Sequence, residues 1–320
     1  MRKDAKTQQT SVTITRVAGY HSRTNTTENY AVQGFEEVRY YTSDRFERLL
    51  REGAFYKRPN GKVMLGFGLE IETECWGISN ETVLAETLNK IILAEFPTGL
   101  FKLQSDGSLR GDSSAEIITQ VMTREFIRNH YADFKKMYDY YFKSYSISAA
   151  RTGNCGMHCN ISLGNFGKTA ETQAEAVRKL FYLINKHYDF FCALLRRDPS
   201  RTRYCSRMDY RNARTLDFRR YGSDHGVCLN LGHFYEGRVE IRLVGGQKDF
   251  ASFRNTMESI FFIVSRVCKI SWADCDDLGK VFKDCNSYVF DRLTLCRREE
   301  RISAEAIEAI RPTVQRVEYI

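Results

Sequence analysis

The sequence predicts an α+β domain in which helices cover one face of a sheet and leave the other face open. Strand-like segments are separated by helical ones, and several strands alternate polar with apolar residues. The clearest of them, residues 66–74, places Glu70, Glu72 and Glu74 at every second position. Successive side chains of a strand point to opposite faces, so these carboxylates share one face and the apolar residues between them share the other. We therefore expect the apolar face to lie against the helices.

The length and composition of the chain are those of one large domain. Its 320 residues, 42% of them hydrophobic, are enough to bury a sizeable core. Residues 1–28 are polar and lack hydrophobic periodicity, which predicts a flexible N-terminal arm. We expect residues 29–300 to form the single domain and residues 301–320 to form a C-terminal helix or tail.

The net charge suits a small anionic ligand. The 48 Lys and Arg residues exceed the 40 Asp and Glu residues by eight and are interspersed with them. This distribution fits a nucleotide as ligand. The sequence has no basic stripe and no zinc-finger spacing, so we do not expect nucleic acid as a partner. No apolar run reaches the ~18–20 residues needed to span a bilayer, so we expect no membrane association.

The cysteines indicate a reducing compartment. Ten cysteines are scattered irregularly along the chain, and no apolar signal segment opens it. We expect reduced, mostly buried thiols in a cytoplasmic protein. Cys155 and Cys159 flank His158, but no second ligand pair follows at a spacing typical of zinc sites, so zinc is disfavoured there.

The first predicted elements lead into and out of the glutamate-rich strand. Residues 44–52 form an amphipathic pattern opened by a Ser-Asp cap, which predicts a short helix. Residues 59–61, Pro-Asn-Gly, predict the turn that precedes the strand. Within residues 79–95, apolar side chains recur at helical spacing and stop before Pro97, which predicts a second helix.

A second group of elements spans residues 101–142. Short strand patterns occur at residues 101–103 and 115–119, and the Ser-Asp-Gly-Ser sequence at 105–108 is typical of a turn between them. Residues 124–142 then follow a helical pattern.

The remaining elements complete the sheet and its helical layer. Residues 156–163 predict a strand, and residues 170–196 predict a long helix. Two strands at 227–231 and 238–244, joined by a connection that contains glycine, predict a hairpin. The strongly apolar segment 250–268 predicts a buried helix.

Polar residues occur at selected positions of these elements. Asp106 belongs to the turn before the strand that carries Glu116, where the neighbours of Glu116 are small or β-branched. His158 and Asn160 are two residues apart in their strand and so share a face. Taken alone, Asp106 also suits a turn former and His158 a core histidine with satisfied hydrogen bonds.

The predicted hairpin carries three more polar residues. Asn230 belongs to its first strand, and Glu240 and Arg242 share a face of the second. An exposed ion pair would account for Glu240 and Arg242, at a contribution of about 0–1 kcal/mol. The carboxylates of residues 70–74 are harder to explain in this way, because like charges on one strand face repel unless a cation neutralises them.

The order of these motifs resembles the amidoligase family. Gly-x-Glu-x-Glu, Asp-Gly-Ser followed by Glu-Ile, Gly-x-His-x-Asn, Leu-Asn-Leu and Val-Glu-Ile-Arg succeed one another within residues 64–270. The family belongs to the carboxylate–amine ligases related to glutamine synthetase and glutamate–cysteine ligase. The resemblance implies a curved antiparallel sheet with helices packed on one face, similar to the catalytic domain of glutamine synthetase.

The resemblance also implies a reaction, the ATP-dependent condensation of a carboxylate with an amine. The carboxylate attacks the γ-phosphate of ATP to give an acyl phosphate and ADP, and the amine displaces phosphate to leave an amide or isopeptide bond. Such chemistry needs positioning and charge neutralisation, which Mg²⁺ and an arginine supply. The substrates would be an amino acid or peptide with a free carboxylate and an amine donor.

The resemblance assigns roles to particular residues. The ligands that it implies for two or more Mg²⁺ ions are Glu70, Glu72, Glu116 and Glu240. The residues that it implies for ATP binding are His158, Asn160, Asn230 and Arg242. Of two catalytic candidates, Asp106 would lie near the incoming amine and Arg242 on the transferring phosphate. Because the family often has histidine at the position of Asn160, we expect Asn160 to orient its neighbours rather than bind metal.

Two other functions stay open at this point. Carboxylates can also hold metals that activate water, as in a metal-dependent hydrolase. A catalytically inactive nucleotide-binding or scaffold protein could share the fold, although every expected metal carboxylate is present. The substrate-binding arginine is equally open among five candidates, which are Arg203, Arg211, Arg214, Arg219 and Arg220.

Overall fold

Strand β3 (Gly66–Cys75) organises the sheet. In the computed structural model of the chain, β3 pairs antiparallel with β5 (Ser113–Thr119) on one side and with β8 (Met157–Ser162) on the other. The structure describes residues 15–17, 29–31, 66–75, 101–104, 109, 113–141, 147–148, 155–198, 200, 203–220, 226–299 and 301–316.

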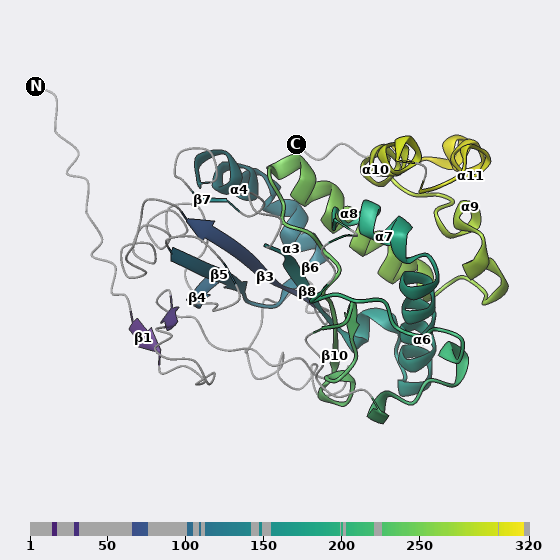
Figure 1. Cartoon of the computed structure of the whole chain (residues 1–320), viewed down its shortest axis with the longest axis horizontal. Helices are drawn as coiled ribbons and strands as arrows, with labels where there is room; N and C mark the ends of the chain where they lie inside the picture. Colours follow the sequence, from purple (N-terminus) through teal and green to yellow (C-terminus); the bar gives the residue numbers. More distant parts are fainter. Residues whose placement is uncertain are drawn as a thin grey trace, which may run out of the picture.

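The other strands extend this sheet in both directions. The strand order is β1-β2-β4-β5-β3-β8-β10-β9, with β6 and β7 paired to the two ends of β3 (Figure 1). Every pair of named strands is antiparallel, and the sheet does not close. The bounds are β1 (Thr15–Val17), β2 (Asn29–Ala31), β4 (Phe101–Gln104), β6 (Met122–Thr123), β7 (Ile147–Ser148), β9 (Leu229–Asn230) and β10 (Arg238–Ile241). The predicted α+β class with an antiparallel sheet is confirmed.

Most of the described helices follow strand β8. The α-helices are α3 (Arg124–Asn129), α4 (Tyr131–Lys136), α6 (Ala170–Lys186), α7 (Tyr188–Leu194), α8 (Phe250–Val267), α9 (Leu278–Val281), α10 (Ser287–Arg298) and α11 (Ala304–Ile310). Side chains cap several N-termini, since Asp249 accepts a hydrogen bond from Ser252 N at 2.7 Å and Asn286 one from Val289 N at 3.0 Å. These caps fix where α8 and α10 begin.

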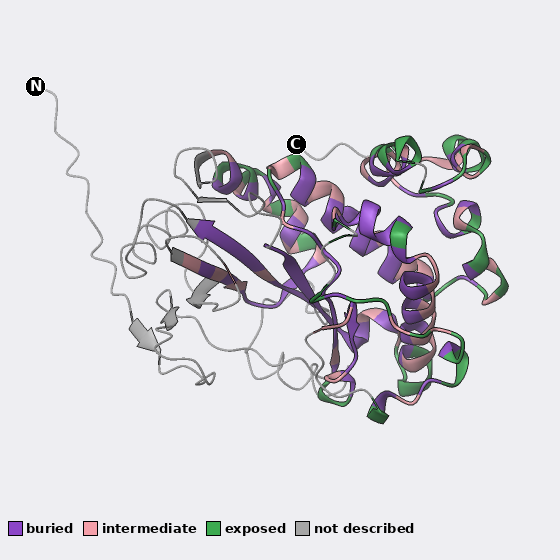
Figure 2. Cartoon of the chain, viewed as in Figure 1, coloured by how far each residue is buried: buried purple, intermediate pink, exposed green. Residues whose placement is uncertain are grey.

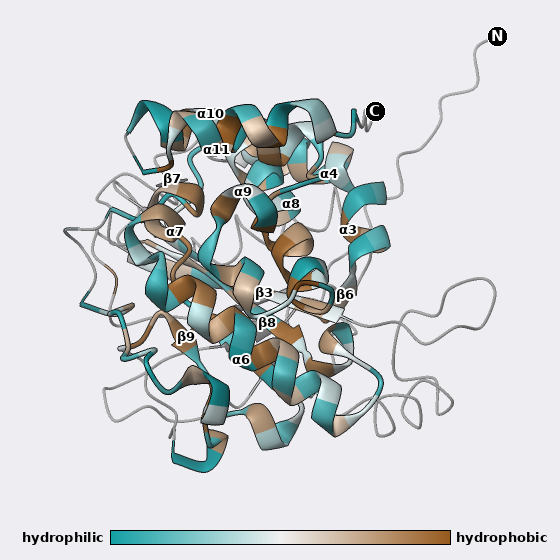
Figure 3. Ribbon diagram, turned by 90° about the vertical axis from the view of Figure 1, so that its right-hand side faces the viewer, coloured by the Kyte–Doolittle hydropathy of each residue, from teal (hydrophilic) through white to brown (hydrophobic). Residues whose placement is uncertain are grey.

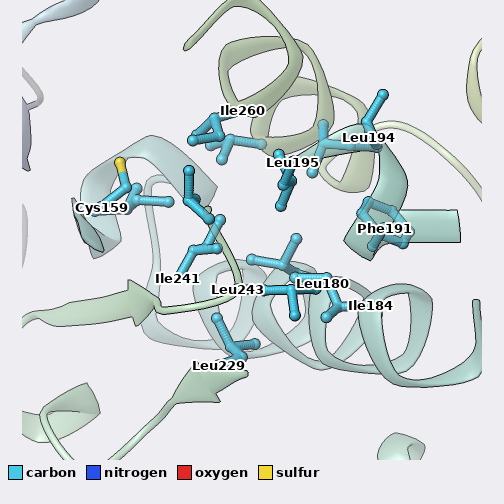
Figure 4. Close-up of a cluster of buried hydrophobic side chains, with 14 of the residues drawn as sticks. Cys159, Leu180, Ile184, Phe191, Leu194, Leu195, Leu229, Ile241, Leu243 and Ile260 are labelled. Carbon is cyan, nitrogen blue, oxygen red and sulfur yellow. The ribbon is translucent and has the colours of Figure 1, made fainter. Parts of the chain in front are cut away.

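The apolar sides of the strands form the core with the helices. Phe67, Leu69 and Ile71 of β3 are at most 1% exposed, and Phe67 packs edge-on against Phe261 of α8 at 4.8 Å between ring centroids. Figure 4 shows side chains of β8, β9 and β10 gathered with side chains of α6, α7 and α8. Buried residues therefore run along the middle strands and the facing sides of these helices (Figure 2). The hydrophobic effect of this burial holds the helical layer on one face of the sheet.

Two predicted helices are each divided by a histidine. The pattern at 124–142 becomes α3, α4 and a π-helical turn (Met137–Tyr141), because the backbone leaves helical geometry at His130 (φ −106°, ψ 15°). The pattern at 170–196 becomes α6 and α7, divided at His187, whose Nε2 lies 3.0 Å from the carbonyl oxygen of Cys275. Hydrophobic spacing continues through both breaks, so it did not reveal them.

Other predicted elements have mixed outcomes. Helix α8 and the antiparallel pairing of the 227–244 hairpin are confirmed, although β9 and β10 are shorter than predicted. The predicted helices at 44–52 and 79–95, and the turns at 59–61 and 105–108, lie outside the described residues. Helix α10 was not predicted.

The described helices mix polar and apolar residues along their length, as Figure 3 shows for α6. Within the described part of the chain, none combines the length and the apolarity that crossing a bilayer requires.

An ion pair to a buried carboxylate joins four helices of the layer. Glu258 of α8, which is fully buried, accepts two hydrogen bonds from the Arg128 guanidinium at 2.8 and 2.6 Å. Its carboxylate also accepts from Tyr131 Oη at 2.9 Å and Asn286 Nδ2 at 2.8 Å. Groups from α3, α4 and the start of α10 thus satisfy the carboxylate, and Arg128 is its counter-ion.

Removing this cation is expected to destabilise the fold. Arg128→Ala leaves the Glu258 charge buried without its counter-ion, which should lower the free energy of unfolding by about 3 kcal/mol. Urea denaturation measures the change, with the exposed Lys283→Ala as a control expected to shift it by less than about 0.5 kcal/mol. Equal effects of the two variants would contradict the role of the ion pair.

Candidate metal centre

The register of three strands brings four predicted site residues to one face of the sheet. Glu70 of β3 lies directly opposite His158 of β8, and Glu72 lies directly opposite Glu116 of β5. Residues that oppose each other across an antiparallel pair project to the same face. Because Glu70 and Glu72 are two residues apart, all four side chains share that face.

Strands β10 and β9 continue the same row of polar side chains. Glu240 lies opposite Asn160 on one side and opposite Asn230 on the other. Arg242 comes two residues later, where its backbone N–H donates to the carbonyl of Cys228 at 2.9 Å. The strand alternation therefore separates this polar face from the apolar face that contacts the helices.

Glu70, Glu116 and His158 form a cluster that could hold a metal ion. One potential ligand atom from each residue lies within 4.8 Å of the other two. Two carboxylates and an imidazole are suitable donors for a divalent cation such as Mg²⁺ or Mn²⁺. Of the predicted metal ligands, Glu70 and Glu116 thus meet directly, and His158 joins them.

Glu72 and Glu240 contact the same imidazole. Glu72 Oε1 lies 3.5 Å from His158 Nε2, and Glu240 Oε1 lies 3.6 Å from His158 Nδ1, beside Glu70 Oε2 at 3.3 Å. Burial opposes a charge on His158, but the hydrogen bond to Glu70 and the charge of Glu72 raise the pKa of its imidazole. These carboxylates therefore favour a cation at this position, whether it is the proton on His158 or a metal ion that replaces it.

The Glu70 carboxyl is stabilised as an anion. Burial alone would raise its pKa, but His158 and the amide of Asn160 lower it to about 2. Asn160 Nδ2 donates to Glu70 Oε1 at 2.7 Å, and Arg238 donates to Asn160 Oδ1. These contacts fit the expectation that Asn160 orients its neighbours.

Asn230 makes a similar arrangement with Glu240. Its Nδ2 donates to Glu240 Oε2 at 3.0 Å, and its Oδ1 accepts from Gly232 N at 2.9 Å. Both ends of the amide are therefore engaged, and its described contacts hold a carboxylate in place.

Glu240 and Arg242 form a buried ion pair, which corrects the expectation of an exposed one. Arg242 Nη1 lies 2.6 Å from Glu240 Oε1, and their side chains are only 11% and 5% exposed. Burial changes the energetics, because removing one partner would leave the other charge uncompensated in the interior. Arg242 Nε is also buried and has no hydrogen-bond partner among the described residues.

The chain matches no protein-family model and no curated protein sequence. Support for a function therefore comes from the residues themselves and from their arrangement on the sheet.

Two arginines of this region were not assigned a role from the sequence. Arg238 shares the face of Glu240 two residues away, so the strand spacing alone could have identified it. Arg197 lies in a loop and donates from Nη2 to the carbonyls of Arg242 at 3.2 Å and Val244 at 2.9 Å. No local pattern signals Arg197, because its role depends on tertiary contacts.

Gly156 allows these groups to approach closely. Its backbone N–H donates to Glu72 Oε2. A Cβ atom on Gly156 would lie 2.7 Å from Arg197 Nη2 and 3.3 Å from Glu72 Oε2. A larger residue would therefore displace Arg197 or Glu72, which explains why a glycine directly precedes β8.

The remaining predicted site residues are elsewhere. Asp106 lies outside the described residues. The candidate substrate-binding arginines are all exposed. Two of them pair with a carboxylate close in sequence, Arg211 with Asp209 at 2.7 Å and Arg219 with Asp217 at 3.3 Å. Their positions do not select one of them as a substrate ligand.

The cysteines have environments that suppress thiolate formation. All nine described cysteines are unpaired, and all but Cys268 are buried. Cys159 points into the core opposite the polar face (Figure 4). Burial, together with the charge of nearby glutamates, raises the pKa values of the Cys155 and Cys159 thiols.

We expect Cys159 to have no part in chemistry. Cys159→Ala should leave turnover unchanged and lower the free energy of unfolding by about 1 kcal/mol, because only a small buried group is lost. Cys192→Ala, which removes a second buried thiol, is the matched control. Loss of turnover in Cys159→Ala alone, with an intact fold, would instead indicate a covalent thioester.

Proposed function

We propose that the chain is an ATP- and Mg²⁺-dependent ligase that joins a carboxylate to an amine through an acyl phosphate. The observation that carries this proposal is the convergence of Glu70, Glu116 and His158 on one sheet face, beside a buried arginine. An acidic cluster next to a guanidinium suits a substrate that is a metal-bound polyphosphate. The catalytic domain of glutamine synthetase, which the motif order resembles, uses this combination, and we propose that fold and a cytoplasmic location for the chain.

The proposed roles follow from the contacts. Glu70 and Glu116 would bind Mg²⁺, and His158 would either share the ion or face the nucleotide phosphates. A bound Mg²⁺ would neutralise part of the negative charge of the phosphates. Glu72 and Glu240 surround the same imidazole and would complete the shell of a second ion.

Arg242 would stabilise the charge that develops on the transferred phosphoryl group. Glu240 holds one end of its guanidinium, and Arg197 holds the backbone that carries it. A guanidinium fixed in this way can contact phosphate oxygens without losing further side-chain entropy. Asn160 and Asn230 would keep their glutamates in position as ligands.

The test is to incubate the chain with ATP, Mg²⁺ and pooled amino acids and dipeptides. We expect ADP, phosphate and an amide product, with repeated turnover of ATP only when both substrates are present. Oxygen-18 placed in the substrate carboxylate should appear in the released phosphate, because the acyl phosphate carries one carboxylate oxygen to it. AMP formation, or hydrolysis of the pool without ATP, would reject the ligase.

A further inference from the structure

Three aromatic rings and two arginines form a connected cluster on the surface. Tyr182 of α6 packs edge-on against both Tyr210 and Trp272, at 5.6 and 5.7 Å between ring centroids. The Arg207 guanidinium lies over the Tyr210 ring and that of Arg214 over the Trp272 ring, each at 5.2 Å. We call these five residues the arginine–aromatic cluster.

Carboxylates hold the rings of this cluster in place. Tyr182 Oη donates to Asp276 Oδ1 at 2.6 Å, and Trp272 Nε1 donates to Glu175 Oε1 at 2.6 Å. The polar atoms of both rings are thereby used, and the rings have fixed orientations. A surface fixed before binding loses little conformational entropy when a partner arrives.

The two arginines of the cluster retain unused charge. Arg207 and Arg214 are exposed and form no ion pair among the described residues. Arg211, which lies between them in sequence, is instead neutralised by Asp209, with Nε–Oδ1 at 2.9 Å and Nη2–Oδ2 at 2.7 Å. Arg207 Nη2 donates to the carbonyl of Lys186 at 3.5 Å, and the other N–H groups of the two stacked guanidiniums remain available for a carboxylate or phosphate.

The cluster is separate from the candidate metal centre. Helix α6 buries Val177, Leu180 and Ile184 on the apolar side of the sheet, whereas Tyr182 is only half-buried and lies off this stripe. The metal centre lies on the other, polar face of the sheet. Figure 3 shows α6 on the near side of the molecule, in front of β8. A ligand at the cluster is thus not a ligand at the metal centre.

We propose that the arginine–aromatic cluster docks a polypeptide segment that carries carboxylate side chains. Tryptophan, tyrosine and arginine are the residues in which binding energy concentrates at protein interfaces. Arg207 and Arg214 supply the matching charge for two carboxylates of the partner.

Neighbouring acidic groups favour a polypeptide over nucleic acid as the partner. Asp209, Asp276 and Glu175 lie among the arginines and are 55%, 54% and 42% exposed. Each of these carboxylates is paired with a cation, Asp209 with Arg211, Asp276 with Lys186 and Glu175 with Lys179. The pairs leave separate positive charges at Arg207 and Arg214 rather than the continuous basic track that a strand with a phosphate at every nucleotide would follow, whereas a peptide can space its charges. The proposal concerns binding alone and does not depend on the ligase reaction.

Fluorescence anisotropy on the full chain tests the proposal. The probe is a labelled peptide of alternating glutamate and glycine, and the comparison probes are a lysine–glycine peptide and an oligothymidylate. We expect saturable binding of the glutamate peptide only. Arg207→Ala and Arg214→Ala should each weaken it about ten-fold, and Arg214→Lys should weaken it several-fold because the planar stacked fork is lost.

Arg211→Ala is the matched control, because it removes the same charge from the same surface at a residue that is already paired. It should change the affinity by less than about two-fold. A loss equal to that of Arg214→Ala would show that net charge alone is responsible and would overturn the proposal. Absence of saturable binding, or tighter binding of the oligothymidylate that depends on Arg207 and Arg214, would overturn it as well.

Discussion

Glu116→Gln is expected to lower the affinity of the chain for a divalent cation by at least about 100-fold. Removing a residue that only hydrogen-bonds to a metal ligand can already weaken metal binding by about that much, and Glu116 is proposed to bind the metal itself. Glutamine keeps the shape of Glu116 but removes the negative charge that a hard cation requires. Because Glu116 is opposite Glu72 on a strand surface, losing one of two like charges should leave the fold intact.

The measurement is electron paramagnetic resonance of Mn²⁺, used in place of Mg²⁺, titrated with the protein in the absence of nucleotide. Thermal unfolding of the same sample checks the fold. Glu299→Gln, at the exposed end of α10, is the matched control and should bind Mn²⁺ as the unmodified chain does. Unchanged Mn²⁺ binding by Glu116→Gln would remove it from the ligand set.

Arg242→Lys is expected to lower kcat for ATP-dependent ligation on the order of 10³-fold, the effect typical of an arginine that stabilises phosphoryl transfer. Lysine keeps one positive charge beside Glu240 but loses the planar fork that contacts two phosphate oxygens at once. Because the charge is retained, the buried Glu240 carboxylate is not left without a partner, and unfolding should change little.

Arg242→Ala distinguishes the contribution of Arg242 to stability from its contribution to turnover. It removes the counter-ion of Glu240 and should lower the free energy of unfolding by about 3–5 kcal/mol. Arg301→Lys, at an exposed position, is the control for the substitution itself. If Arg242→Lys unfolds much more easily yet turns over ATP normally, the arginine has only the structural role of an ion-pair partner.

The sequence predicted the faces of the strands but not their register. Alternation in residues 66–74 was sufficient to assign Glu70 and Glu72 to one face, because side-chain direction depends only on the local backbone. That Glu70 meets His158 depends on how β3 and β8 align, and no local pattern specifies this alignment.

Burial was the other quantity that local patterns left undetermined. Glu240 and Arg242 have the spacing of a surface pair, and only the packing around β10 shows that both are buried. Arg197 was missed for the same reason, because its contacts to residues 242 and 244 come from a loop distant in sequence.

The chain positions of its members also determine when the candidate metal centre can form during synthesis. Glu70 and Glu240 are 170 positions apart (240 − 70), and the imidazole between them comes 88 positions after Glu70 (158 − 70). A nascent chain that ends before residue 157 has β3 with its glutamates but has neither the imidazole nor the arginine that balances them. Closing such long loops is a late and slow event in folding. The cluster of Glu70, Glu116 and His158 can therefore assemble only after β8 has been made, and Glu240 and Arg242 join this polar face only when β10 pairs with β8.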